Sequence, residues 1–260
     1  GPIDIAAWSR HRWLQGRVRV PIGERLEASV SARTYNEFRS NGTPYTGNTS
    51  QENFGSVTLA GHPTAAFDWN ASAYVQEQTF TSRFSAVNAT RSAETPANDQ
   101  FAVPADAAGA AWTGTWRHGD GSRTTAGGDW RTVTGETREH YFFDGAAGDF
   151  SRLRVAGGKQ KGGGVFALHE RPLTESLRAI IGARVDWWKD SDGHRRESLL
   201  ATGVASRDEN YAPLDGNEFS PSAGLVWTSG RAWRVHTNVQ QGYRRPTLNE
   251  LHRPFRIGAN

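Results

Sequence analysis

Two short motifs in this chain contain residue types that bind ligands in other proteins. The run Gly157–Gly164 places Lys159 among glycines, which is the composition of a phosphate-binding loop. Such a loop needs Gly-Lys-Ser/Thr at the start of a helix, whereas Gln160 follows the lysine and strand-like residues follow the glycines. The segment Asp190–Gly193 resembles part of a calcium loop, but no helical pattern flanks it. The first run indicates a small-residue strand and the second a loop tip.

Other catalytic and metal-binding motifs are absent from the sequence. The eight His residues show no paired ligand spacing, and the absence of cysteine excludes a thiolate metal site or a disulfide. There is no Gly-x-Ser-x-Gly elbow to present a nucleophile. The net charge of +3 is small for 260 residues, which argues against nucleic-acid binding. We therefore expect no enzyme activity, catalytic residue, cofactor, metal or nucleic-acid partner.

Alternation of apolar and polar residues is the dominant pattern along the chain. It is clearest at Leu177–Trp188, where apolar side chains occupy every second position. Similar alternation runs through 26–33, 67–76, 218–227 and 233–240. Successive Cβ atoms of a strand point to opposite faces, so each segment has one apolar and one polar face. About ten strands are predicted on this basis, at 13–20, 25–37, 53–60, 66–78, 108–118, 122–133, 152–169, 176–189, 217–228 and 231–242.

The predicted connections alternate between short and long. The short ones are turns rich in Gly, Pro and Asp, at Pro21–Glu24, Gly61–Ala65, Gly119–Gly121, Glu170–Glu175 and Ser229–Gly230. The long polar ones are 38–52, 79–107, 134–151 and 190–216. An up-and-down transmembrane barrel has this rhythm, with short periplasmic turns, long extracellular loops and aromatic girdles that suit the abundant Trp. No helical pattern is available to cover the apolar faces, so the fold class predicted is an all-β, antiparallel, up-and-down transmembrane β-barrel in contact with lipid.

The alternation also assigns side chains to the two faces of the sheet. The convex outer side should carry Leu177, Ile181, Val185, Val235 and Val239. The concave side should carry Arg184, Asp186, Arg234 and Asn238. A slip of one residue would invert every assignment.

The C-terminal stretch Gly242–Gly258 resembles a hallmark segment of TonB-dependent outer-membrane receptors. In that family a run of an aromatic residue, Arg, Pro, Thr or Asn and Leu follows a barrel strand and leads into an extracellular loop. The positions here that match the signature are Arg244, Pro246, Thr247, Leu248, Glu250 and Leu251. Supporting likenesses occur at 128–136, 157–167, 182–188 and 219–227, and the resemblance covers about residues 105–260 well.

The resemblance implies a receptor in the outer membrane of a Gram-negative bacterium that captures a scarce nutrient, such as a ferric siderophore or cobalamin. The family's TonB–ExbB–ExbD energy complex acts through an N-terminal region that includes a plug and a coupling box. Capture by extracellular loops would fall to aromatic and charged loop residues, and the candidates are Tyr45, Phe80, Arg83, Phe84, Tyr141, Phe142, Tyr211 and Tyr243.

Departures from the family pattern concern the ends of the chain. The plug, the coupling box and the closing strands expected after Asn260 are not in this sequence, and ten strands are about half of the ~22 of a plugged transporter barrel. We expect residues 1–260 to be part of a larger barrel, with unpaired sheet edges and aggregation in the absence of detergent. The alternatives are a passive porin, an outer-membrane barrel enzyme and a soluble β-rich carbohydrate-binding module.

Overall fold

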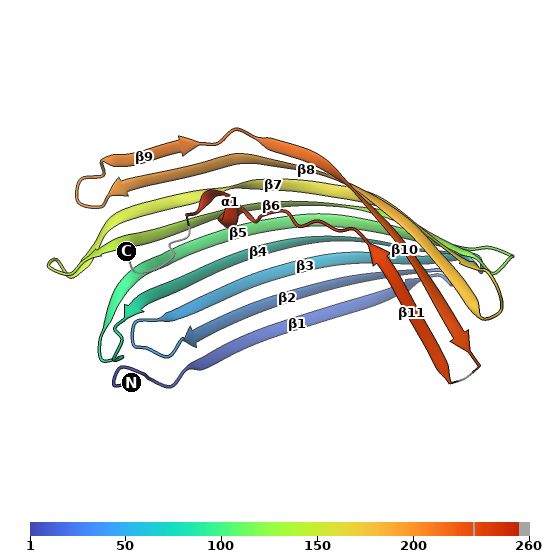
Figure 1. The fold of residues 1–260 in the computed structure, drawn as a ribbon, viewed down its shortest axis with the longest axis horizontal. Helices are drawn as coiled ribbons and strands as arrows, with labels where there is room; N and C mark the ends of the chain where they lie inside the picture. Colours follow the sequence, from blue (N-terminus) through green and yellow to red (C-terminus); the bar gives the residue numbers. More distant parts are fainter. Residues whose placement is uncertain (231, 255–260) are drawn as a thin grey trace.

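A single curved antiparallel sheet makes up almost all of the computed structural model, which describes residues 1–230 and 232–254 (Figure 1). Its strands are β1 (Trp8–Ile22), β2 (Leu26–Ser40), β3 (Gly47–Thr64), β4 (Phe67–Val87), β5 (Glu94–Arg117), β6 (Arg123–Asp144), β7 (Asp149–Pro172), β8 (Leu177–Leu199), β9 (Ala205–Asn210), β10 (Leu214–Ser229) and β11 (Trp233–Gln240). One short helix, α1 (Leu248–His252), follows the last strand.

The strands follow one another across the sheet in sequence order. The path is β1 to β8, then β10 and β11, and every neighbouring pair is antiparallel. The short strand β9 pairs with the end of β8 that lies farthest from the turns. The ten predicted strands correspond to β1–β8, β10 and β11, so the all-β, up-and-down prediction is confirmed. β9 was not predicted because it lies inside the expected long connection 190–216.

The prediction of four long loops is wrong. The strands continue through most of the polar segments, and the connections shrink to 41–46, 88–93 and 145–148, with 200–204 and 211–213 on either side of β9. We call the strand residues inside 38–52, 79–107, 134–151 and 190–216 the strand extensions. Backbone hydrogen bonds between neighbouring strands need no apolar face, so the ladder continues where the alternation fades. A turn is present at each predicted short connection, but strand residues occupy part of the predicted ranges, since β3 runs to Thr64, β7 to Pro172 and β10 to Ser229.

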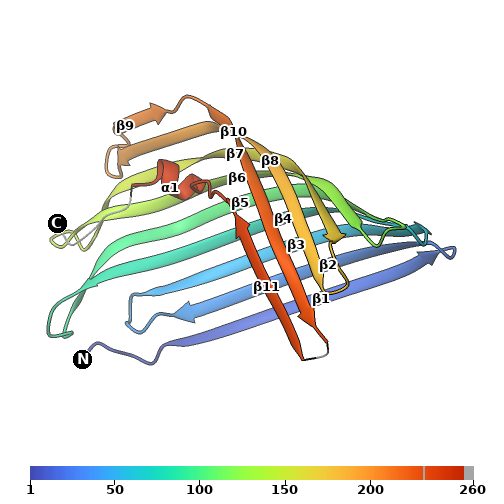
Figure 2. The same cartoon turned by 45° about the vertical axis from the view of Figure 1, so that its right-hand side comes forward.

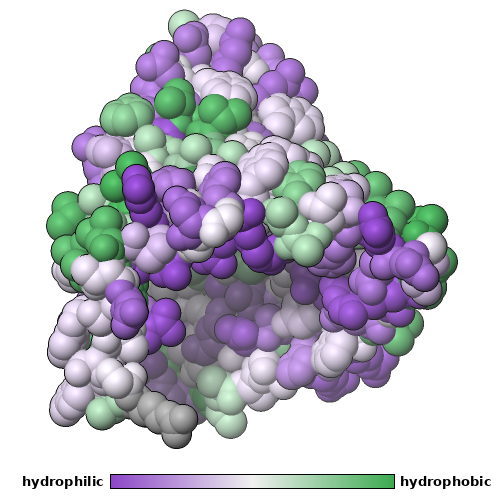
Figure 3. Space-filling view, turned by 90° about the vertical axis from the view of Figure 1, so that its right-hand side faces the viewer, coloured by the Kyte–Doolittle hydropathy of each residue, from purple (hydrophilic) through white to green (hydrophobic). Residues whose placement is uncertain are grey.

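The two faces of the sheet differ in chemistry. On the convex face Ile181 and Val185 are 60% and 42% exposed, and their cross-strand partners on β10 are Ala223 and Phe219. Val235 and Val239 lie on the same face, opposite Trp227 and Ala223. Arg184, Asp186, Arg234 and Asn238 lie on the other face. Figure 3 shows that face as a hollow lined by hydrophilic residues, with hydrophobic residues gathered on the outer surface.

The sheet encloses almost no apolar core of its own. Among the described residues, Ala156 and Val226 are the only buried hydrophobic side chains. Large apolar side chains such as Val18, Val57 and Val165 are instead about half exposed, at 64%, 47% and 52%. This distribution suits a sheet whose convex face is covered by lipid. Within residues 1–230 and 232–254, no helix is long and apolar enough to cross a membrane.

The sheet is open in the described part of the chain. β1 pairs with β2 alone, and β11 pairs with β10 alone, although β10 and β11 swing across the concave side (Figure 2). Unpaired edges normally attract further strands. That these residues belong to a larger barrel, and that the chain aggregates without detergent, remain predictions.

Candidate functional site

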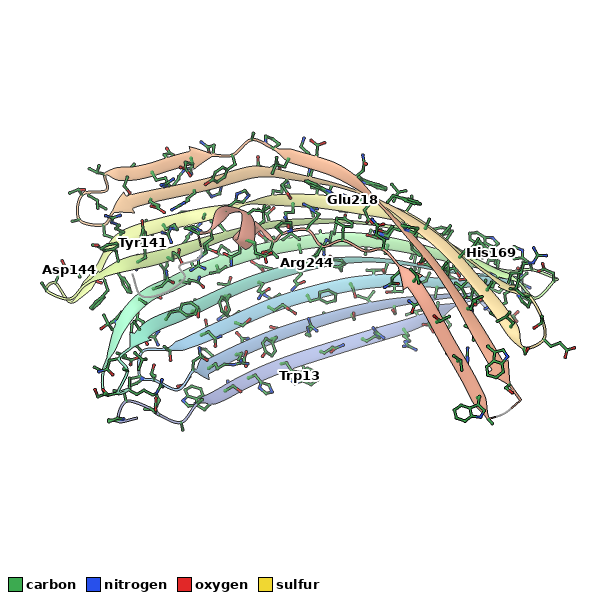
Figure 4. The ribbon with its side chains drawn as sticks, in the orientation of Figure 1. Trp13, Tyr141, Asp144, His169, Glu218 and Arg244 are labelled. Atoms are coloured by element: carbon green, nitrogen blue, oxygen red, sulfur yellow. The ribbon has the colours of Figure 1, made fainter. Side chains whose placement is uncertain are left out.

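The segment after β11 crosses the concave face of the sheet and carries α1. We call residues 241–253 the strap. It lies over β6, β7 and β8, the strands that α1 contacts. Figure 4 shows Arg244 of the strap midway along the sheet and Tyr141, in the strand extension of β6, toward one end of it. Residues 255–258 of the predicted signature stretch lie outside the described residues.

Several signature residues hold the strap in shape. Thr247 caps α1: its hydroxyl accepts a hydrogen bond from the Glu250 backbone N–H at 3.3 Å, and its own N–H donates to the Glu250 carboxylate at 2.8 Å. Such a reciprocal capping box satisfies two otherwise unpaired N–H groups. Arg244 donates to both Glu250 oxygens at 3.0 and 2.7 Å. These hydrogen bonds from Arg244 hold the pKa of Glu250 at about 2, well below its usual range.

Four contacts fix the first half of the strap to the concave face of the sheet. The Arg245 guanidinium forms an ion pair with Asp190, and it lies 4.8 Å from the centre of the Trp188 ring. Its Nη1 also donates to the Lys161 backbone carbonyl at 3.2 Å. The Pro246 carbonyl accepts a hydrogen bond from the Gln160 amide at 3.0 Å.

Glycines on the concave face of β7 and β8 leave space for α1. A Cβ atom at Gly158 would lie 3.2 Å from Leu248 Cδ2 and 3.2 Å from His252 Nε2. A Cβ atom at Gly193 would lie only 2.6 Å from His252 Cε1. The glycine run of β7, first considered as a phosphate loop, is therefore a strand against which the helix packs. Its role was not predicted, because a glycine run in a sequence does not identify the segment that packs on it.

A buried carboxylate anchors the end of the strap. Glu139 on β6 is fully buried, and it accepts hydrogen bonds from Arg253 at 3.0 and 2.7 Å. It also accepts from Arg154 on β7 at 2.8 Å and from Asn98 on β5 at 2.8 Å. A charge out of water is stable only when paired and hydrogen-bonded, as here. Sequence reasoning missed Glu139, since nothing in the sequence distinguishes it from a solvated loop acid.

The same network reaches β8 through Glu197. This carboxylate accepts hydrogen bonds from Arg154 at 2.7 Å and from the Tyr141 hydroxyl at 2.8 Å. Arg195 donates to it at 2.8 and 2.7 Å. The candidate residue Tyr141 is thus part of a buried network, with the Arg154 guanidinium 4.0 Å from its ring centre.

Beneath the strap is a cavity of about 560 Å³. Its charged lining residues are Asp129, Arg131, Arg184, Asp186, Arg244 and Arg245. Arg184 is already matched, because it donates to both Asp186 oxygens at 2.8 and 2.9 Å and to Asp129 at 2.7 Å. Arg244 forms an ion pair with Glu250, and Arg245 forms one with Asp190. The cavity is therefore polar without a large excess of either charge.

The structure does not bring the predicted substrate residues into one cluster. Tyr45 lies in the connection 41–46, with the Arg83 guanidinium of β4 5.5 Å from its ring centre. Phe142 on β6 has the Arg152 guanidinium 4.7 Å from its ring centre. Phe80 and Phe84 lie on β4, and within the described residues neither stacks on another candidate.

The remaining two candidates lie against the strap. Tyr211 stacks on His252, with ring centres 5.1 Å apart, and its hydroxyl donates to Glu209 at 2.7 Å. Tyr243 lines the cavity beneath the strap and is 41% exposed. Five of the eight candidates therefore lie on strands, where loops were expected. In the described part of the chain, no group of three or more His, Asp or Glu could hold a metal ion.

Comparison with known proteins identifies the family. The sequence model of the family described as TonB dependent receptor-like, beta-barrel matches residues 9–260. The chain belongs to the TonB-dependent receptor family. Receptors of this family are transporters of the Gram-negative outer membrane and not enzymes, and the membership places these strands in that membrane. A search of curated proteins returned no match.

Solved structures of TonB-dependent receptors share the fold. The Fiu ferric-catecholate import receptor of E. coli K12 aligns with a TM-score of 0.71 at 10% identity, over 92% of this chain and 48% of that one. The copper transporter OprC aligns with a TM-score of 0.69 at 13% identity, over 92% and 38%. The ferric yersiniabactin uptake receptor FyuA of Yersinia pestis aligns with a TM-score of 0.67 at 13% identity, over 88% of this chain and 37% of that one. The chain thus spans less than half the length of these proteins.

Proposed function

We propose that this chain forms part of the barrel wall of a receptor that imports a scarce nutrient across the outer membrane. Release of the nutrient to the periplasm would be driven by the TonB–ExbB–ExbD complex, acting through a region N-terminal to the barrel. Family membership supports this proposal, as does the division between an apolar convex face and a polar concave wall.

For the nutrient, we propose a ferric siderophore in preference to cobalamin. The observation that carries this choice is the pairing of guanidinium groups with aromatic rings at the strand extensions. Arg83 lies over Tyr45 and Arg152 lies over Phe142, at 5.5 and 4.7 Å. Each pair offers a positive charge and an aromatic face together, which suits an anionic ferric chelate with aromatic rings.

The test uses the receptor that carries this chain, purified in detergent, with tryptophan fluorescence as the readout. It is titrated with ferric catecholate, hydroxamate and carboxylate siderophores and with cobalamin. We expect saturable binding of a ferric siderophore, most tightly the catecholate. Arg83→Gln and Arg152→Gln should each weaken that binding by roughly 10-fold or more, as expected for a lost charged contact.

The matched control is Arg25→Gln, which removes a guanidinium at a turn on the opposite end of the sheet and should leave affinity unchanged. Saturable binding of cobalamin with no siderophore binding would refute the choice of nutrient. Uptake of radioactive iron in cells that lack the TonB–ExbB–ExbD complex should fall to background. Undiminished uptake would refute the energised transport itself.

A further inference from the structure

A second cavity of the concave face lies at the end of the sheet that carries the short turns. It has a volume of about 630 Å³, and residues of β5–β8, β10 and β11 line it. Figure 3 looks onto this end of the sheet and shows hydrophilic residues around the hollow. We call it the turn-end cavity, and its Arg and Glu lining residues are Arg117, Arg123, Glu170, Arg178 and Arg234.

Strand register brings these charges together. Arg117 on β5 and Arg123 on β6 are direct cross-strand partners, and Glu170 on β7 is the next partner in the same row. Like charges directly opposite each other destabilise a sheet. Arg178 on β8 and Arg234 on β11 line the same cavity because the sheet curves and β11 swings across the concave side.

The guanidinium groups of the turn-end cavity are only partly neutralised. Arg117 forms an ion pair with Asp68 on β4, and Arg123 forms one with Glu170. The nearest approach of Arg178 to a carboxylate is 4.0 Å, from its Nη1 to Oε2 of the same Glu170. Arg178 therefore shares a carboxylate that Arg123 already holds more closely.

Arg234 on β11 is the least neutralised of the four. Its side chain is exposed, and within residues 1–230 and 232–254 it forms no ion pair. The cavity lining also contains the apolar side chains of Ile180 and Val226, of which Val226 is buried. Apolar walls screen a charge less than water does, so they strengthen the positive potential inside the cavity.

The two cavities of the concave face differ in their charge balance. Four guanidinium groups and two carboxylates line the cavity beneath the strap, and Glu250 and Asp190 pair with two of these guanidinium groups from outside the lining. The turn-end cavity also has four guanidinium groups, yet Asp68 is the only described carboxylate that pairs with them from outside the lining. Four carboxylates thus balance the first cavity and two serve the second. The turn-end cavity keeps an excess of positive charge, which attracts anions.

We propose that the turn-end cavity is a second binding site for the imported anionic ferric chelate, which occupies it after leaving the strand extensions. This inference rests on the proposed function. The short turns of such a barrel face the periplasm, so the cavity lies on the exit side of the sheet. The guanidinium groups of Arg178 and Arg234 donate hydrogen bonds to the chelate's oxygen atoms, and Ile180 and Val226 contact its rings.

Binding at the turn-end cavity has to be weaker than binding at the strand extensions. A transported species needs sites that attract it and that it can still leave. Arg178 and Arg234 meet this requirement, because their side chains remain accessible to water, which screens their charge. The chelate is therefore held at the exit without being trapped there.

The experiment counts the chelate bound per receptor by equilibrium dialysis, on the receptor that carries this chain in detergent. The probe is the tris-catecholate complex of radioactive iron(III), which is strongly anionic. The comparison is the tris-acetohydroxamate complex of iron(III), which is uncharged. We expect a first equivalent of the catecholate complex at the strand extensions and a second, weaker equivalent at the turn-end cavity. The hydroxamate complex should not fill the second site, since it carries no charge for the guanidinium groups.

Two variants address the second equivalent directly. Arg178→Gln and Arg234→Gln should each weaken it roughly 10-fold, as expected for one lost charged contact, and leave the first equivalent unchanged. Retention of the first equivalent also shows that the variant is folded. Arg171→Gln is the matched control, because it removes a guanidinium at the same end of the sheet. Arg171 follows Glu170 on β7 and so points to the opposite, convex face, and its loss should change neither equivalent.

The outcomes separate this inference from the proposed function. A single equivalent that Arg83→Gln weakens and Arg178→Gln does not would overturn the second site and leave the proposed function standing. A single equivalent that Arg178→Gln weakens and Arg83→Gln does not would refute the site at the strand extensions and keep the turn-end site. A second equivalent that Arg171→Gln weakens as much as Arg234→Gln does would show general attraction of anions and overturn the proposal. Equal filling of the second site by the uncharged hydroxamate complex would overturn it as well.

Discussion

The long strands of this sheet have two regions that follow different sequence rules. Near the turns, every second residue is apolar and lies on the convex face, as in Leu177–Trp187. In the strand extensions polar residues occur on both faces: on β6, Glu136 and Arg138 lie on one face, and Glu139 and Tyr141 lie on the other. The backbone ladder is continuous through both regions. The alternation is therefore imposed by contact with lipid, and strand formation itself does not require it.

What stabilises each region differs accordingly. The apolar band gains from transfer of its convex side chains to lipid. The extensions depend on cross-strand hydrogen bonds and on concave ion pairs such as Arg154 with Glu139 and Glu197. Loss of a buried charge should therefore lower stability when it is made in the extensions. Loss of lipid contact should lower stability when it is made in the apolar band.

The largest effect is expected from Glu139→Gln. The change leaves Arg154 and Arg253 without their shared carboxylate in a buried site, which costs about 3–5 kcal/mol of unfolding free energy. The measurement is urea unfolding of the protein refolded in lipid vesicles. Asp106→Asn, on an exposed extension residue without an ion pair among the described residues, should change stability by less than about 0.5 kcal/mol. A loss below about 1 kcal/mol for Glu139→Gln would show that the network does not stabilise the extensions.

A second pair of variants compares the two regions on a single face of β3. Val57 lies on the convex face in the apolar band and is 47% exposed, and Gln51 lies on the same face in the extension. Val57→Arg should cost about 2–4 kcal/mol because it places a charge in the hydrocarbon region. Gln51→Arg should change the free energy of unfolding by less than about 0.5 kcal/mol, since this side chain is exposed to water. Equal costs in the urea titration would mean that the two regions have the same surroundings.

A smaller effect is expected at the strap. Thr247→Ala removes the cap of α1 and should destabilise its docked form by about 1 kcal/mol. Amide hydrogen exchange of Leu251 and Arg253, whose N–H groups bond to Thr247 and Asn249, should become roughly fivefold faster. Thr247→Ser keeps the capping hydroxyl and is the control. Exchange at the same rate in all three proteins would exclude a stabilising role for the cap.

The smallest effect is a pH dependence of strap docking. Burial lowers the pKa of His252 below its ordinary value of 6.5, against an opposing effect of Asp190. The undocked His252 then binds a proton more readily than the docked one, so docking is favoured above about pH 6.5 and weakens as the pH falls below it. The Glu250 cap, with its pKa of about 2, stays ionised throughout this window.

The measurement is hydrogen exchange of the strap amides between pH 7 and pH 5, corrected for the intrinsic rate. Besides Asp190, His252 faces His194 on β8 and the stacked ring of Tyr211. His252→Gln should abolish the dependence. A dependence of the same size in that variant would assign it to another group.

The comparison of the two regions also explains which parts of the fold could be predicted from the sequence. Ten strands and their neighbours were predictable because lipid contact imposes a period of two in the band. The extensions and β9 were not, because polar residues on both faces look like a loop. The partnership of Glu139 with Arg253 was out of reach, since it joins residues 114 positions apart that become neighbours only when the strap crosses the sheet.

The signature residues show the same limit. Arg244, Thr247 and Glu250 were identified by resemblance, and their mutual capping is local in sequence. Which wall residues receive the strap depends on strand register. Gly158 and Gly193 meet α1 only because β7 and β8 bring them side by side.

Docking of the strap also depends on the pairing of the strands beneath it. Its anchors reach Glu139 on β6, Gln160 on β7 and Asp190 on β8, at sequence separations of 114, 86 and 55 residues. A slip of one residue in β6 or β8 would turn Glu139 or Asp190 to the convex side and leave Arg253 or Arg245 without that partner. The docked strap therefore requires the native register of all three strands. Its contacts stabilise that register over one shifted by a single residue.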